Sequence, residues 1–154
     1  LKIGEKEYSS TLQCVHDAAN KDLSLADRKL VYDKAMGLQR LYTKLANTVD
    51  SINRWQSKMK SDTVAFRKSK SMQQAYDTLQ HIKSELMATK QTSMFADEEK
   101  IREKISELYS TFCGMESKPN TTQLQAIESL EADFYQQQVL LDKLRTQFHS
   151  LLID

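Results

Sequence analysis

Glycine and proline are scarce in this sequence. Its 154 residues include three glycines and one proline, well below the roughly 7% and 5% of an average protein. Leucine, lysine, glutamine, glutamate and alanine, which suit helices, are plentiful instead. This composition favours long helices over many short strands. The sequence therefore predicts an all-α fold and argues against an all-β or doubly wound one.

Cysteine is also rare, and the two cysteines match no metal-binding or redox spacing. Cys14 and Cys113 lie far apart in the sequence. Cys113 follows Phe112 on an apolar helical face, so we expect it to be a small buried thiol. A disulfide between the two cysteines would need their Cα atoms within about 7 Å, and that alternative stays open.

The three histidines stand in unrelated contexts. Helical bundles with a di-iron or di-manganese centre carry Glu-x-x-His pairs, but Thr78 precedes His81 and Thr146 precedes His149 at that spacing. The remaining histidine, His16, has no such partner either. His-Glu-x-x-His, Cys-x-x-Cys and glycine-rich phosphate loops are likewise missing from the sequence. We therefore predict no metal, no cofactor and no catalytic residue in this chain.

Neither sign of charge dominates, and no apolar run is long. Lysine and arginine number 22 against 21 aspartates and glutamates, a net charge of +1. This balance supplies no overall field that would attract nucleic acid or an anionic membrane. Membrane-spanning helices need about 20 apolar residues in succession, and the apolar runs here are only a few residues long. We expect neither nucleic-acid binding nor membrane insertion.

Residues 1–20 differ in periodicity from the rest of the chain. Ile3 and the residues from Tyr8 to Val15 alternate in polarity around Gly4, which predicts a β-hairpin with its turn near that glycine, followed by a linker. The first residue is Leu1, without a charged-then-apolar leader. We therefore expect residues 1–20 to be the remnant of an upstream β-domain in a longer protein. An arm lying against the helices is the alternative.

Apolar residues recur at heptad spacing between Val31 and Met59. This pattern predicts one long helix at about residues 24–60, with Ser24 and Asp27 forming a capping box at its start. Gly37 interrupts the helix, and we expect a neighbouring helix to approach closely there. Two adjacent lines form the seam: Val31, Leu38, Leu45, Ile52 and Met59 on one, Leu41, Thr48 and Trp55 on the other.

Three further helices are predicted at about residues 62–90, 97–113 and 122–152. The first two turns of the 62–90 segment are poor in apolar residues, which indicates fraying or a bend there. Asp97 is the expected cap of the third helix, and Thr122 with Gln125 forms the expected box of the fourth. The fourth seam comprises Ile127, Leu130, Phe134, Leu141, Leu144, Phe148 and Leu151.

The connections between these helices are short. Short connections make neighbouring helices antiparallel, so we predict an up-down-up-down four-helix bundle over residues 21–154. A three-helix bundle with a broken third element is one alternative. A dimeric coiled coil is another, because the heptads fit it nearly as well.

Local charge is uneven at the first helix corner. Between Arg54 and Lys70 there are six basic residues, Arg54, Lys58, Lys60, Arg67, Lys68 and Lys70, against Asp62 alone. Such a tip could hold an acidic protein or an anionic glycan, while a solvated charged corner is the alternative. The candidate interaction corner consists of Arg54, Trp55, Lys58, Met59, Phe66 and Arg67.

The order of several segments resembles a known family. Ile3-Gly4-Glu5-Lys6-Glu7-Tyr8, then Asp17, then Ser24-Leu25-Ala26-Asp27 opening a long helix are similar to the C-terminal region of bacterial sortilin-like (VPS10, BNR or Asp-box) β-propeller proteins, often labelled glycosyl hydrolases. Residues 100–108 and the Pro119 turn are similar to that family's closing helices. Asp-Pro-Arg after the hairpin and Asn-Tyr-Pro before the third helix, common in the family, are missing.

The resemblance implies a periplasmic or secreted protein whose propeller precedes this chain. Its partners would be the upstream domains of the same protein. The propeller's Ser-x-Asp-x-Gly-x-Thr-Trp box does not occur here, so no catalytic residue is carried over and any hydrolase activity would belong to the upstream part. We predict a non-catalytic helical accessory domain, structural or protein-binding. A free-standing helical adaptor or regulator that binds a protein partner is the alternative.

Overall fold

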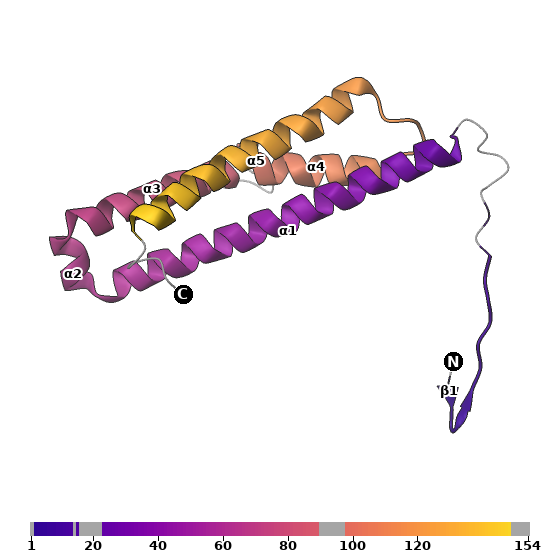
Figure 1. The fold of residues 1–154 in the computed structure, drawn as a ribbon, viewed down its shortest axis with the longest axis horizontal. Helices are drawn as coiled ribbons and strands as arrows, with labels where there is room; N and C mark the ends of the chain where they lie inside the picture. Colours follow the sequence, from indigo (N-terminus) through magenta and orange to yellow (C-terminus); the bar gives the residue numbers. More distant parts are fainter. Residues whose placement is uncertain (1, 14, 16–22, 90–97, 149–154) are drawn as a thin grey trace.

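The computed structural model describes residues 2–13, 15, 23–89 and 98–148. In these ranges the chain is mostly helical, and the predicted all-α class is confirmed (Figure 1). The described elements are β1 (Lys2–Ile3), β2 (Lys6–Glu7), α1 (Leu25–Ser61), α2 (Thr63–Lys68), α3 (Lys70–Leu86), α4 (Ile101–Cys113) and α5 (Thr121–Gln147).

The helices form three roughly parallel rods, of which α1 is the first, α3 and α4 together the second, and α5 the third. α1 runs the length of the molecule, α3 and α4 follow one another beside it in the opposite direction, and α5 returns parallel to α1 (Figure 1). Side-chain contacts agree with these directions. Lys83 Nζ of α3 donates to Asn53 Oδ1 at 2.7 Å and Gln80 contacts Gln56, so the numbering of α1 falls as that of α3 rises. Gln138 Nε2 of α5 donates to Thr48 Oγ1 at 3.0 Å and Arg145 covers Trp55, so the numbering of both helices rises together. The predicted up-down-up-down order of four helices is not confirmed, because α3 and α4 share one direction and lie end to end.

α1 is the helix against which the others pack. It contains 37 residues, which is about 55 Å at roughly 1.5 Å per residue. Ser24 caps it, because its hydroxyl accepts from the Asp27 backbone N–H at 3.1 Å. All five residues of the first predicted line, from Val31 to Met59, are buried. The predicted close approach at Gly37 is wrong, since a Cβ built there would meet nothing within 4 Å.

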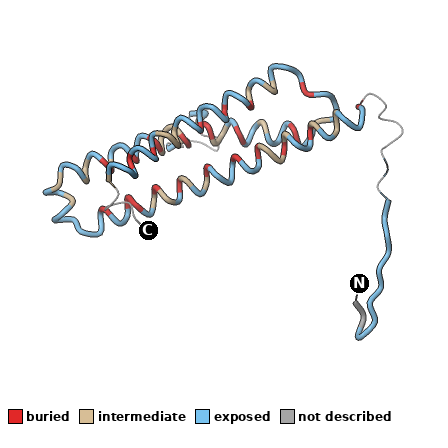
Figure 2. The backbone as a smooth tube through the Cα atoms, viewed as in Figure 1, coloured by how far each residue is buried: buried red, intermediate tan, exposed pale blue. Residues whose placement is uncertain are grey.

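The buried residues form one core, and Figure 2 shows that they recur along the helices. They lie on the faces of α1, α3, α4 and α5 that point toward one another. Its fully buried large members are Phe112, Leu38, Leu45, Ile52, Met59, Leu79, Ile82, Leu86 and Ile105. One polar side chain, Gln56, is buried among them, and its Nε2 donates to Gln80 Oε1 at 3.1 Å. A buried amide needs such a partner to offset its lost hydration.

The predicted 62–90 helix is two helices that meet at Ser69. Asp62 caps the short α2 by accepting from the backbone N–H groups of Val64 and Ala65. Ser69 then caps α3, and its own N–H still bonds back to Ala65. The bend therefore lies where apolar residues are sparse, because little buried surface holds these turns on the core.

The third and fourth predicted helices begin at other residues than expected. α4 starts at Ile101 with Lys100 as its N-cap, four residues later than predicted, and Asp97 lies outside the described residues. The Glu103 carboxylate explains this start: it accepts from the Lys100 N–H at 3.3 Å and from the Ala88 N–H at 3.1 Å. One side chain thus joins the end of α3 to the beginning of α4.

α5 starts one residue earlier than predicted and uses a different capping box. The Asn120 Oδ1 accepts from the Gln123 N–H at 2.8 Å, and the Gln123 Oε1 accepts from the Asn120 N–H at 3.0 Å. This pair replaces the predicted pair of Thr122 and Gln125. All members of the predicted fourth seam from Ile127 to Leu144 are buried and Phe148 is partly buried, while Leu151 lies outside the described residues.

The N-terminal hairpin is confirmed but very short. β1 and β2 pair antiparallel with Ile3 opposite Lys6, and Gly4 has the positive φ of 61° that the turn requires. The alternation from Tyr8 onward does not make a strand at residues 8–13 or 15, all of which are exposed. This described arm lies apart from the helices (Figure 1), so the alternative of an arm packed against them is not seen there.

Candidate functional site

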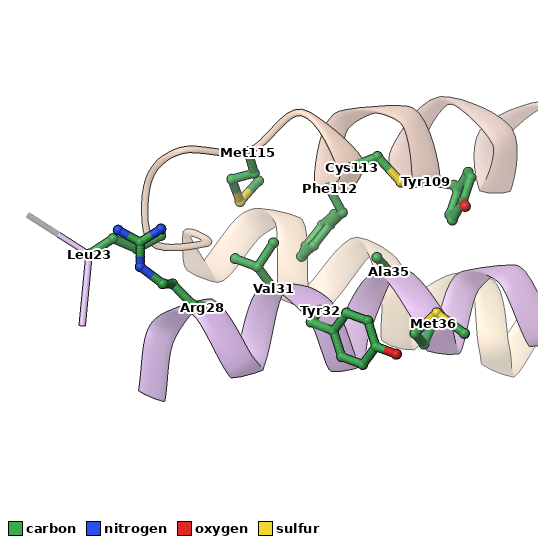
Figure 3. A pocket seen from close by; sticks show the side chains of 10 residues that line it. All are labelled: Leu23, Arg28, Val31, Tyr32, Ala35, Met36, Tyr109, Phe112, Cys113 and Met115. Carbon is green, nitrogen blue, oxygen red and sulfur yellow. The ribbon is translucent and has the colours of Figure 1, made fainter. Parts of the chain in front are cut away.

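Two surfaces toward opposite ends of α1 are candidate functional sites. The first, which we call the basic corner, comprises residues 54–70 around the α1–α2–α3 bend. The second, which we call the apolar cleft, lies between the first half of α1 and the end of α4 (Figure 3).

The cations of the basic corner point into solvent. All six are exposed, and Asp62, the one acidic residue among them, has its Oδ1 engaged by two backbone N–H groups as the α2 cap. Within the described part of the chain, five of the six make no ion pair with a carboxylate at 4.0 Å or less. These five are Arg54, Lys60, Arg67, Lys68 and Lys70.

The apolar residues predicted for the same corner face inward instead. Trp55 is 4% exposed and Met59 is 2% exposed, so both belong to the core. Phe66 is partly buried and meets the Tyr76 ring edge-on, with centroids 5.5 Å apart. The structure therefore separates the candidate corner into an outer charged set, Arg54, Lys58 and Arg67, and an inner apolar set. Binding at this corner stays a prediction.

Two cations cover the inner rings of the corner. Lys60 Nζ lies 4.3 Å from the centroid of the Tyr76 ring, and Arg145 Cζ lies 5.6 Å from the Trp55 ring. Both distances suit a cation–π interaction. The Trp55 Nε1 has no hydrogen-bond partner among the described residues. Arg145 belongs to α5, where it also pairs with Asp142 at 4.0 Å.

The apolar cleft is a hollow of about 540 Å³. Val31 and Ala35 of α1 and Phe112 of α4 are buried core residues that form its floor, and more exposed side chains such as Tyr32 and Tyr109 form its rim (Figure 3). The full lining comprises Leu23, Arg28, Val31, Tyr32, Ala35, Met36, Tyr109, Phe112, Cys113 and Met115. Nearly all of these residues are apolar or aromatic, which is typical of a binding pocket.

The rim of the cleft carries two tyrosines and a thiol. Tyr32 is 63% exposed and Tyr109 is 37% exposed. Cys113 is exposed too, so the prediction of a buried thiol is wrong. The reason is helical geometry: Phe112 points into the core, and the next residue lies about 100° further around α4. Cys14 lies outside the described residues. A hydrogen bond with Cys113 and the thiolate charge raise the pKa of the Tyr109 phenol.

A polar clamp holds the end of the bundle beside the cleft. The Ser24 hydroxyl donates to the Asp27 carboxylate at 2.6 Å, and Lys118 Nζ lies 3.8 Å from the other carboxylate oxygen. Lys118 belongs to the α4–α5 connection, so the pair joins that loop to the start of α1. The hydrogen bond from Ser24, followed by the charge of Lys118, lowers the pKa of Asp27.

The sequence pattern predicted the seam of α1 but not the cleft. The heptad positions showed which residues face inward, whereas the unfilled space depends on which α4 side chain lies opposite Val31 and Ala35. The neighbouring Tyr32 is no specific signal, because Tyr42 follows the seam residue Leu41 in the same way and is also exposed, outside the cleft lining.

No described group of three or more His, Cys, Asp or Glu side chains is arranged to hold a metal ion. His81 is exposed on α3, while His16 and His149 lie outside the described residues. Among the described helices, none is both long enough and apolar enough for a membrane span.

Comparison with known protein families, with curated proteins and with solved structures finds no match to this chain. The relationship to sortilin-like propeller proteins therefore stays a prediction from the sequence.

Proposed function

We propose that this chain is a non-catalytic helical accessory domain that packs against the upstream domains of the same protein. On the sequence resemblance, that protein is an exported bacterial β-propeller protein. The observation that carries the proposal is the apolar cleft with Tyr32 and Tyr109 exposed at its rim. An open apolar hollow of this kind gains free energy when a partner's side chains fill it.

The position of the cleft supports an upstream domain as its occupant. Leu23 is part of the cleft lining and comes directly after the N-terminal segment of the chain. Twenty-two residues precede Leu23, and an extended chain reaches at most about 3.5 Å per residue. A domain joined before Leu1 is therefore tethered within reach of the cleft, at a high effective concentration.

The test is small-angle X-ray scattering of the full-length parent protein. We expect a compact particle, and we expect Tyr32→Glu/Tyr109→Glu to extend it because two charges would have to be buried in the contact. Tyr135→Glu is the matched control, since Tyr135 is 68% exposed on α5 and lies outside the cleft lining.

Two results would overturn this proposal. One is an extended parent whose dimensions do not change in the double variant. The other is a parent in which no β-domain precedes Leu1. Circular dichroism of each variant shows that its helices remain folded.

The second candidate function is an adaptor that binds a protein partner through the basic corner. The observation that favours it is a set of five exposed cations around the α1–α2–α3 bend that make no ion pair with a described carboxylate: Arg54, Lys60, Arg67, Lys68 and Lys70.

A further inference from the structure

Charge is segregated along the molecule. Residues 54–70 contain six basic residues and one acidic residue, a net charge of +5, whereas the whole chain carries +1. The remaining residues therefore carry a net charge of −4. A chain that is close to neutral as a whole thus concentrates positive potential at one end of its bundle, where the field can attract a negative partner.

Five cations of the corner make no ion pair with a described carboxylate: Arg54, Lys60, Arg67, Lys68 and Lys70. Some cations elsewhere are paired, as Lys29 is with Asp33 at 2.7 Å, whereas others, such as Arg40 and Lys44, make no ion pair with a described carboxylate. The corner differs in its density of positive charge, because Asp62 is the one acidic residue among residues 54–70 and serves as a helix cap. Exposed cations without a carboxylate partner remain able to pair with groups on another molecule.

The low exposure of the aromatic rings at the basic corner indicates which class of partner suits this surface. Single-stranded nucleic acids are held by stacking bases on exposed aromatic rings, and sugar rings pack on aromatic faces in the same way. At this corner the Trp55 ring is 4% exposed under Arg145, and the Tyr76 ring lies under Lys60. Trp55 is buried and Tyr76 is only partly exposed, so neither residue is an exposed aromatic platform. Nucleic acids and glycans are therefore less suited to this surface than protein carboxylates.

One large apolar side chain is exposed among the cations. Val64 of α2 is 62% exposed, between Asp62 and the basic pair Arg67 and Lys68. An acidic peptide with apolar residues among its carboxylates would contact both features at once. Electrostatic attraction would speed its association, and the apolar contact would slow its dissociation.

We propose that the basic corner is a docking surface for an acidic segment of another protein. Arg54, Lys60, Arg67, Lys68 and Lys70 provide the charge that recognises its carboxylates. This surface lies at the other end of α1 from the apolar cleft, so it is independent of the proposed packing of upstream domains.

The test uses a labelled peptide of alternating pairs of glutamate and leucine, with fluorescence anisotropy as the readout. We expect the full chain to bind it, and Arg67→Glu/Lys68→Glu/Lys70→Glu to bind at least about tenfold more weakly. Raising the salt from about 50 to 300 mM should weaken wild-type binding severalfold, because exposed charges are screened. A peptide with glutamine in place of glutamate should not bind.

The matched control is Arg40→Glu/Lys44→Glu/Lys104→Glu, which changes the net charge equally. These three residues are exposed and make no ion pair in the described part of the chain, and they lie away from the corner. We expect less than about a threefold effect, because attraction falls off over a Debye length of about 8–10 Å. Should the charge reversals unfold the corner, Arg67→Gln/Lys68→Gln/Lys70→Gln replaces them.

Three outcomes would overturn the proposal. The first is equal weakening by the two triple variants, which would show a response to total charge alone. The second is binding of the glutamine peptide as tightly as the glutamate peptide. The third is tighter binding of phosphatidylserine vesicles or an oligothymidylate than of the glutamate peptide, which would assign the corner to a membrane or a nucleic acid instead.

Discussion

The two ends of α1 use the same apolar seam but present opposite surfaces. At the basic corner the large side chains Trp55 and Met59 fill the space between helices, and charged residues remain outside. At the cleft the seam residues are Val31 and Ala35, which leave a hollow of about 540 Å³ opposite Phe112. The two ends of one seam therefore differ in the volume of their side chains, which is large at the basic corner and small at the cleft.

This difference has a consequence for binding. The closed end would attract a partner mainly through its outer charges, with Val64 as an added apolar contact, so binding there should depend strongly on salt. The open end can accept apolar side chains, so binding there should depend on shape and depend little on salt. We therefore assign the proposed acidic segment to the basic corner and the proposed upstream domain to the apolar cleft.

The largest expected effect is at the closed end. Trp55→Ala should lower the free energy of unfolding by about 3–5 kcal/mol, because a large side chain leaves a cavity in a packed core. Urea denaturation followed by circular dichroism measures this loss. Tyr135→Ala is the control, since an exposed ring should change stability by less than about 0.5 kcal/mol. Similar values for both variants would show that the corner is not closed.

The next effect compares the same substitution at a closed and an open position. Ala75 of α3 is fully buried, and Ala75→Leu should cost about 1–3 kcal/mol because the added methyl groups have no space. Ala35 lines the cleft, and Ala35→Leu should change stability by less than about 1 kcal/mol because the hollow accepts the larger side chain. A cost at Ala35 equal to that at Ala75 would contradict an open cleft.

Much of this architecture could be predicted from the sequence, and what escaped prediction depends on contacts between helices. The heptads of α1 and α5 identified their buried faces, and the poor apolar content after Asp62 indicated the bend at Ser69. Heptads do not specify the neighbour of a face, so they could not show that α3 and α4 lie end to end. The carboxylate of Glu103, which joins these two helices across 15 residues, has no local pattern.

The same limit applies to the candidate site. The sequence located the charges of the basic corner because they are close together in the chain. It placed Trp55 and Phe66 in the same patch, although their rings turn inward against α5 and Tyr76. Direction relative to the core is set by helices distant in sequence, which a local charge count does not include.

A smaller effect is expected midway along α1, at Gly37. A Cβ at this position would meet no atom within 4 Å, so Gly37→Ala should raise the free energy of unfolding by up to about 1 kcal/mol through helix propensity. Ala46→Gly, also on α1 and partly buried, should lower it by a similar amount. Destabilisation by Gly37→Ala would show that α1 is approached more closely there than the open position predicts.

The smallest expected effect concerns the clamp beside the cleft. The pKa of Asp27 is lowered by the Ser24 hydrogen bond and by Lys118. A carboxyl whose pKa is lower in the folded state stabilises the fold above its unfolded pKa, near 4, and this contribution is lost as the pH falls through the folded pKa. Below about pH 4 the wild-type Tm should therefore fall more steeply than that of Asp27→Asn. Asp50→Asn, at an exposed position of α1, should retain the wild-type slope. Parallel slopes for wild type and Asp27→Asn would show that the clamp does not stabilise the open end. Apolar contacts alone would then join α1 to the α4–α5 connection there.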